Sequence, residues 1–153
     1  MILMIRSGGL EDPQVLAMLK FHFDTNIDVT PPGSAHVFDV SRLKAEDVSF
    51  WSAWDGDRLM GVGALKRMTA DHGEIKSMHS RQDVRRSGIG SAMLLHIMAE
   101  AKAAGLKHLS LETGSFDFFK PAVALYRKHG FVECEAFGDY KPDPYSTFMT
   151  MAI

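Results

Sequence analysis

The sequence predicts a mixed α/β fold in which strands and helices alternate around one central sheet. Three observations predict it. Two strand-like runs flank the turn Gly56-Asp57 and form a hairpin. A strand, a helix and a second strand follow one another over residues 74–113, and a helical crossover of this kind places its two strands parallel. Two further strand-like segments near the end of the sequence then close the sheet in the antiparallel sense.

The first part of the chain predicts one long helix. Asp12 is a favourable N-cap residue and Pro13 suits the first helical position, so the helix should start there and end near Asn26. Lys20 and Asp24 can face water on its outer side. Apolar residues recur at helical spacing and predict a single buried stripe, consisting of Val15, Leu16, Leu19 and Phe23.

The next segment predicts a loop, a short helix and the hairpin. Residues 30–34 form a cluster of helix-breaking residues that is expected to run over the surface, and Phe38 to Ala45 are expected to form a short helix. The two hairpin strands are expected over Val48 to Trp54 and over Leu59 to Lys66. Trp51, in the first of them, is interpreted as a core residue rather than as a wall of a binding pocket.

The strand over residues 74–79 leads into the longest helix of the second half. Alternation places its side chains on two faces, unless a bulge interrupts the count. One face would carry Glu74, Lys76 and Met78, and the other Ile75, Ser77 and His79. The elements expected after it are a helix from Ile89 to Gly105, a strand from Lys107 to Thr113, a helix from Pro121 to His129, and strands from Val132 to Phe137 and from Ser146 to Met151.

Composition restricts the class of protein. The chain has 153 residues, of which 46% are hydrophobic, and this is enough for one domain over residues 1–153 with one core. Lys and Arg number 17 against 19 Asp and Glu, so no overall positive field would attract nucleic acid or an anionic membrane. Cys134 has no partner for an internal disulfide and is interpreted as a packing residue. With no secretory or membrane-spanning run in the sequence, the expected location is cytoplasmic.

The segment Arg85-Arg86-Ser87-Gly88-Ile89-Gly90 predicts an anion-binding loop. Its glycines allow backbone conformations that are closed to other residues, and an uninterrupted helix follows directly. The first turn of a helix leaves N–H groups without partners, and a pyrophosphate fits such a terminus. The spacing does not match the P-loop, which requires Lys and Ser/Thr after its last glycine. It also does not match the dinucleotide fingerprint, because Met93 stands where a small residue is required.

The pattern Arg/Gln-x-x-Gly-x-Gly/Ala, carried here by Arg85, Gly88 and Gly90, resembles the GNAT superfamily of acetyl-CoA-dependent N-acetyltransferases. A helix that contains Leu125-Tyr126 and ends in Gly130-Phe131 resembles the second signature of that family. Upstream, the strand over residues 74–79 resembles the one that enters the family's phosphate loop. The resemblance implies about four helices and a mostly antiparallel sheet of about seven strands, with a parallel, splayed pair in its middle.

The resemblance further implies acetyl-CoA as co-substrate. Its pantetheine arm would lie between the strand that ends at Met78-His79-Ser80 and the parallel strand that carries Glu112, and its pyrophosphate would bind N–H groups from Arg86 to Ser91. The expected cofactor-binding residues are therefore Met78, His79, Ser80, Arg85, Arg86, Ser87, Gly88, Ile89, Gly90, Ser91, Phe119 and Tyr126.

The expected reaction is direct attack of an amine on the thioester, without an acyl-enzyme. A lysine-type amine has a pKa of about 10.4, so freeing it at neutral pH costs roughly 4 to 5 kcal/mol and calls for a base. Glu74 is the first choice, because it lies on the strand expected beside the thioester, and Glu112 is the second. Lys76 lies on the same face as Glu74, and an ion pair between them is the alternative, purely structural interpretation of Glu74.

Tyr126 occupies the family's tyrosine position in Leu-Tyr-x-x-x-Gly-Phe and is the expected general acid for the CoA thiolate. The alternative is a half-buried helix tyrosine bound to a backbone carbonyl. Many family members carry an asparagine three residues before the helix alanine, where this chain has Phe119. In place of a side-chain amide contact to the pantetheine, Phe119 or a backbone group near Gly114 would have to take over this role.

No metal is expected, because the seven histidines show no ligand spacing and aminolysis of a thioester needs none. The expected acceptor is the amine of a small molecule or of a peptide, with a preference for a small metabolite. Nucleic acid and membrane are not expected partners, and the family makes a homodimer plausible. The alternative function is a non-catalytic module that binds acetyl-CoA and reports its level to a partner.

Overall fold

The computed structural model describes residues 2–29, 40–81, 83 and 87–153, without the side chains of residues 25–29. In chain order the elements are β1 (Met4–Ser7), α1 (Pro13–Val29), α2 (Val40–Leu43), β2 (Val48–Asp55), β3 (Arg58–Arg67), β4 (His72–Ser80), α3 (Ile89–Ala103), β5 (His108–Gly114), η2 (Asp117–Phe119), α4 (Lys120–Lys128), β6 (Val132–Glu133) and β7 (Ser146–Ala152). The predicted loop over residues 30–34, and the start of the helix predicted from Phe38, lie outside the described residues.

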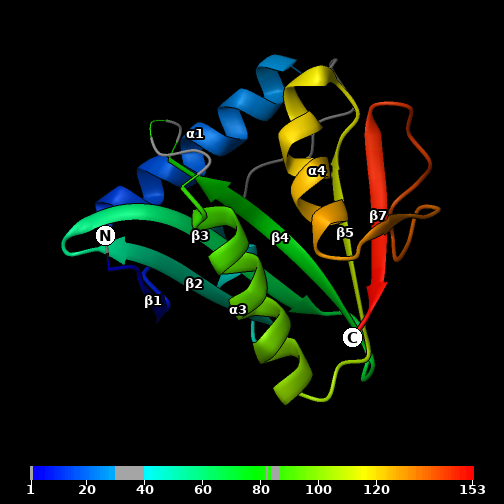
Figure 1. Cartoon of the computed structure of the whole chain (residues 1–153), viewed down its shortest axis with the longest axis horizontal. Coiled ribbons are helices and arrows are strands. Elements are labelled where there is room, and N and C mark those ends of the chain that lie inside the picture. The colour runs from blue at the N-terminus through cyan, green and yellow to red at the C-terminus, as the bar shows by residue number, and fades with distance from the viewer. Residues whose placement is uncertain (1, 30–39, 82, 84–86) are drawn as a thin grey trace.

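The described strands form one seven-stranded sheet in the order β1-β2-β3-β4-β5-β7-β6. Neighbouring strands are antiparallel except for β4 and β5, which are parallel as the sequence predicts. Figure 1 shows α3 and α4 in front of this sheet and α1 behind it. The fold is therefore the mixed α/β arrangement expected from the resemblance, with the parallel pair in its middle.

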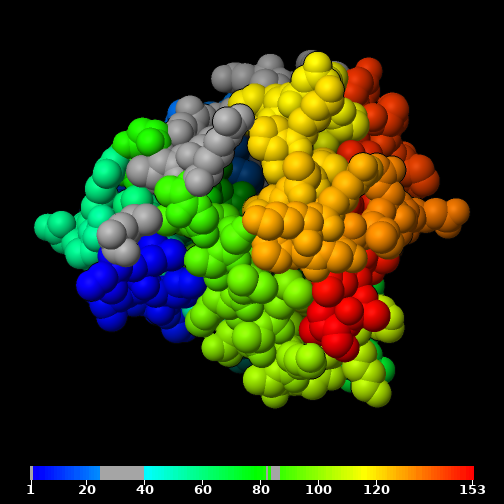
Figure 2. All heavy atoms as spheres, viewed as in Figure 1, coloured from blue at the N-terminus to red at the C-terminus, as the bar shows by residue number. Residues whose placement is uncertain are grey.

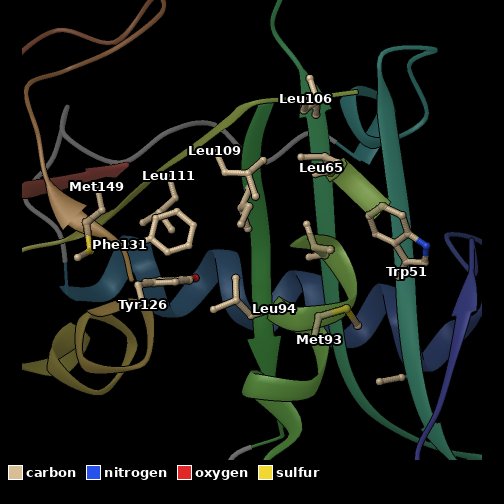
Figure 3. Close-up of a cluster of buried hydrophobic side chains, with 14 residues drawn as sticks. Trp51, Leu65, Met93, Leu94, Leu106, Leu109, Leu111, Tyr126, Phe131 and Met149 are labelled. Atoms are coloured by element: carbon tan, nitrogen blue, oxygen red, sulfur yellow. The ribbon is translucent and has the colours of Figure 1, made fainter. Parts of the chain in front are cut away.

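A hydrophobic cluster fills each face of the sheet. On the face of α3 and α4, Leu94 and Ile97 pack with strand residues such as Leu109 and Leu111 (Figure 3). Trp51 belongs to this cluster and is buried, which confirms its interpretation as a core residue. On the other face, Val15 and Leu19 of α1 pack against strand residues that include Phe50, Trp54, Val62 and Ala64.

The buried stripe of α1 differs from the prediction at two positions. Leu16 is exposed and Phe23 is only partly buried, whereas Met18 is buried beside Val15 and Leu19. The hydrophobic spacing allowed either residue, and the direction from which the sheet meets the helix decides between them. Lys20 and Asp24 form an exposed ion pair across one helical turn, as their water-facing side predicts.

The strand after α4 is shorter than predicted. The sequence predicts it from Val132 to Phe137, but β6 ends at Glu133. Beyond Cys134, the chain leaves the sheet edge, and the Phe137 ring packs against Phe148 and Tyr140 with centroids 5.8 and 5.2 Å away. Packing of this partly buried ring against β7 takes the place of further pairing along the sheet edge.

Gly63 allows α3 to lie close to β3. A β-carbon on Gly63 would lie 2.9 Å from both Ile97 Cδ1 and Met93 Cγ. Gly63→Val is therefore expected to lower the free energy of unfolding by about 1 to 3 kcal/mol through overpacking. Urea unfolding measures this, with Ser49→Val, at an exposed position of the neighbouring strand β2, as control. An unchanged unfolding midpoint for Gly63→Val would contradict the close packing.

Candidate active site

The centre of the sheet contains a gap between its two parallel strands. The β4–β5 ladder runs from His72↔His108 to Ile75↔Leu111 and stops there. Beyond it, β4 pairs with β3 up to Ser80, and β5 pairs with β7 up to Gly114. Figure 1 shows the two strands diverging from a common point with α4 in front of the opening. In Figure 2 a hollow lies on this face beside α4, which is yellow and orange.

A bulge in β4 corrects the predicted alternation. Ser77 has φ 55°, and the register against β3 shifts between Val62↔His79 and Ala64↔Lys76. Met78 therefore packs in the core on the α3 face, although alternation placed it with Glu74. His79 lies on the opposite face, where it meets α1. A bulge is the feature that the predicted alternation excepts, and it accounts for the changed faces of these two residues.

The start of α3 presents backbone N–H groups at the edge of the gap. Gly88 is the N-cap residue, with φ 87° and no side-chain cap, and the first helical bond runs from Ala92 N to Gly88 O. The N–H groups of Ile89, Gly90 and Ser91 precede that bond and have no partner within the helix. Ser87 is exposed just before the cap, whereas the predicted phosphate ligands Arg85 and Arg86 lie outside the described residues.

Close packing holds this helix start against β4 and α4. A β-carbon on Gly90 would lie 3.0 Å from Leu125 Cδ2 and 3.7 Å from Ser80 Oγ. The Ser91 hydroxyl lies 3.1 Å from His129 Nε2, beyond the end of α4. The predicted residues Ser80, Gly90 and Ser91 therefore lie together, and His129 is a neighbour that the sequence motif did not indicate.

Glu74 lies near the base of the gap, on the face opposite α3. It is 5% exposed and pairs in register with Ser110 of β5, one residue before the ladder ends. Lys76 Nζ lies 3.6 Å from Glu74 Oε2, so the ion pair considered in the sequence analysis is present. Glu112 is partly exposed on the same face, where β5 has left the ladder.

Tyr140 joins this group from the connection between β6 and β7. Its hydroxyl donates a hydrogen bond of 2.6 Å to Glu74 Oε2. Burial, followed by the negative charges of Glu74 and Glu112, raises the pKa of Tyr140, so the phenol keeps its proton at neutral pH. The sequence analysis missed this residue. The signal that was present is the aromatic pair Phe137 and Tyr140 in an otherwise polar segment.

Tyr126 lies on the other side of the sheet, within the α3 and α4 cluster. Figure 3 shows its hydroxyl oxygen pointing from α4 into the space between Leu111 and Leu94. The residue is 6% exposed, and burial raises the pKa of its phenol. Within the described part of the chain, no hydrogen bond of this hydroxyl is found, so the backbone-bonded alternative finds no support there. The phenol proton is thus available to a ligand.

Phe119 packs directly on β5. Its ring occupies the place where a β-carbon on Gly114 would stand, and it also meets Phe118 edge to face at 5.1 Å between centroids. The ring therefore covers the end of β5 beside the gap, at the position of the asparagine found in many family members. A side chain at Gly114 would displace it.

A pair of histidines lies at the far end of β4. His22 Nδ1 of α1 is 2.9 Å from His79 Nδ1, so one ring donates a proton and the other accepts it. Burial lowers the pKa of His22 to about 4, which keeps its imidazole neutral at pH 7. His22 is a second residue that sequence reasoning missed, because its partner is 57 positions away.

No group of three or more His, Cys, Asp or Glu residues in the described ranges is arranged to hold a metal ion. Among the described helices, none combines the length and the apolar character needed to cross a bilayer.

The comparisons with known proteins agree with this geometry. A sequence model of the acetyltransferase (GNAT) family matches residues 11–131. The chain is 43% identical to the uncharacterized N-acetyltransferase YsnE of Bacillus subtilis, over 97% of this chain and 99% of that protein. It is 41% identical to the uncharacterized N-acetyltransferase YedL of Escherichia coli, over 97% and 94%. Its fold also matches the crystal structure of the PaiA N-acetyltransferase of Thermoplasma acidophilum in complex with coenzyme A, with TM-score 0.78 and 17% identity over the whole of both chains.

The class of protein is an acyltransferase. Its features here are the splayed parallel strands β4 and β5 and the start of α3, which has no side-chain cap. The chain belongs to the GNAT acetyltransferase family.

Proposed function

We propose that this protein, acting as one domain, transfers the acetyl group of acetyl-CoA to a primary amine by direct attack. The observation that carries the proposal is the gap between β4 and β5, which has a buried carboxylate on one face of the sheet and a buried phenol on the other. A thioester held in this gap would meet a proton acceptor on one side and a proton donor on the other.

The ends of β4 and β5 would hold the pantetheine arm in the manner of an added strand, because each has backbone groups facing the opening. The N–H groups of Ile89, Gly90 and Ser91 would bind the pyrophosphate at the positive end of the α3 dipole. Crystallisation of the Thermoplasma relative with coenzyme A supports this cofactor class.

Glu74 would take the proton of the attacking ammonium group, and the neutral amine would then add to the thioester carbonyl. As the tetrahedral intermediate collapses, the C–S bond breaks and the electron pair stays on the CoA sulfur. Tyr126 would donate its phenol proton to this sulfur. The second proton of the amine would leave the nitrogen as the amide forms and, through solvent, restore the Tyr126 phenol. Burial raises the pKa of Tyr126, so the phenol is protonated before the reaction begins.

Tyr126→Phe is expected to lower kcat by about 10- to 100-fold with little change in the KM for acetyl-CoA, because the proton is needed only as the thiolate leaves. The measurement is steady-state release of CoA thiol. Stability should be retained, since the hydroxyl has no hydrogen-bond partner in the described part of the chain. An undiminished kcat would remove Tyr126 from this role.

The acceptor is proposed to be a small-molecule amine, with peptide amines as the second class. The test is purified protein with acetyl-CoA against amines, amino acids and peptides, with detection of CoA thiol and of the acetylated product by mass. Turnover with one class identifies the acceptor. Tight binding of acetyl-CoA without turnover of any acceptor would favour the non-catalytic binding module instead.

A further inference from the structure

The connection between β6 and β7 folds back over the face of the sheet that carries Glu74. Phe137, Tyr140 and Phe148 form a closed group of three rings, with centroid separations of 5.2 to 5.8 Å and edge-to-face contacts throughout. Phe148 is buried in β7 and anchors the other two rings. Tyr140 is therefore held by packing, and its hydroxyl reaches a carboxylate 66 positions earlier in the chain.

The contacts of Glu74 distinguish its two oxygen atoms. The Tyr140 hydroxyl donates to Oε2 at 2.6 Å, and Lys76 Nζ lies 3.6 Å from the same oxygen. Within the described residues, no donor to Oε1 is found. A carboxylate held through one oxygen cannot rotate freely, so the other oxygen keeps a fixed direction.

The charged and titratable groups around this contact come from several elements. Glu112 of β5 and Arg42 of α2 act on Tyr140 with opposite signs, and Lys76 of β4 lies beside Glu74. His72, at the start of β4, interacts with Glu74 and with His108. Burial and the charges of Glu74 and Glu112 raise the pKa of Tyr140, so its phenol keeps its proton and donates to Glu74 at neutral pH.

We propose that Tyr140 is a positioning residue for the reaction, which holds Glu74 through Oε2 and leaves Oε1 to accept the proton of the attacking amine. The inference rests on the proposed function, because it requires Glu74 to be the base. It assigns to the β6–β7 connection a part in proton transfer.

The test compares two substitutions of the same chemistry in the same connection. Tyr140→Phe removes the donor and keeps the ring, whereas Tyr145→Phe, whose ring stacks on Phe116, is the matched control. Tyr140→Phe is expected to lower kcat about tenfold with an unchanged KM for acetyl-CoA. Loss of a hydrogen bond to the carboxylate favours its protonated form, so the acidic limb of the kcat/KM profile should move to higher pH. Tyr145→Phe should leave both quantities unchanged.

The Glu74→Gln background separates this inference from the proposed function. If Tyr140 acts through Glu74, Tyr140→Phe should cause no further loss in that background. A fully active Glu74→Gln enzyme would remove the base and the inference together. A strongly impaired Glu74→Gln enzyme combined with a Tyr140→Phe enzyme of wild-type kcat and pH profile would overturn the inference alone.

Tyrosine ionisation gives a readout that needs no acceptor. Because Glu74 raises the pKa of Tyr140 both by its charge and by its hydrogen bond, Glu74→Gln should bring that pKa down. Phenolate absorbance reports it in a Tyr126→Phe, Tyr145→Phe background, where Tyr140 is the one remaining tyrosine of the chain's three. An unchanged ionisation of Tyr140 would show that the two groups do not interact in solution and would overturn the inference.

Discussion

Glu74→Gln is expected to lower kcat for amine acetylation by about 10²- to 10⁴-fold, the range typical of a lost general base. Glutamine has the same shape and can still accept the hydrogen bond of Tyr140, so the fold around the gap should be kept. It cannot take a proton from the acceptor. The KM for acetyl-CoA should change little, because the proposed role of Glu74 is to act on the acceptor amine and not to bind acetyl-CoA.

The pH dependence of this variant gives the sharper measurement. Below the pKa of the acceptor, about 10.4 for a lysine-type amine, the neutral fraction rises tenfold for each pH unit. The rate of Glu74→Gln should therefore keep rising with pH after the wild-type rate has levelled off, so that the deficit shrinks in alkaline solution. Glu135→Gln, at an exposed position outside the site, is the control. A large loss in Glu112→Gln without one in Glu74→Gln would transfer the role to Glu112.

Gly88→Glu is expected to weaken acetyl-CoA binding at least about 100-fold, or about 2.7 kcal/mol. Two effects add. Gly88 has φ 87°, a conformation that other residues adopt only with strain, and a carboxylate there would repel the pyrophosphate expected at the start of α3. Calorimetric titration with acetyl-CoA measures the loss.

Gly105→Glu is a matched control for Gly88→Glu. Gly105 has φ 86°, and at both positions a β-carbon would meet no atom within 4 Å. The two substitutions therefore impose similar backbone strain and the same charge change, but Gly105 follows the other end of α3. The control should keep its affinity for acetyl-CoA. Equal affinity of the Gly88→Glu protein and the wild type, with both folded, would exclude this helix start as the phosphate site.

Local signals account for the parts of the fold that the sequence predicts. The hairpin around Gly56, the helix that begins at Ile89 and its stop at Gly105 depend on turn and capping residues close to them in the chain. The parallel direction of β4 and β5 follows from the crossover connection through α3 that joins them. None of these features requires knowledge of distant contacts.

The remaining features depend on pairs far apart in the chain. The bulge at Ser77 places a residue other than glycine at positive φ, and its position is set by pairing with β3 rather than by a local motif. Tyr140 meets Glu74, and His22 meets His79, across 66 and 57 positions. The strand and motif positions of Glu74 and Tyr126 made them candidate site residues. No local pattern indicated that Tyr140 donates a hydrogen bond to Glu74.

The place of β7 between β5 and β6 has a consequence for synthesis on the ribosome. While residues 146–152 are still inside the exit tunnel, β5 lacks its antiparallel neighbour, and β6 has no strand to join. Phe148, which anchors the ring of Tyr140, is also missing at that stage. A nascent chain that already contains the glycine loop and Tyr126 therefore still lacks the ring packing that holds Tyr140 beside Glu74. Competence for acetyl transfer should begin only when β7 has emerged and has inserted between its two neighbours.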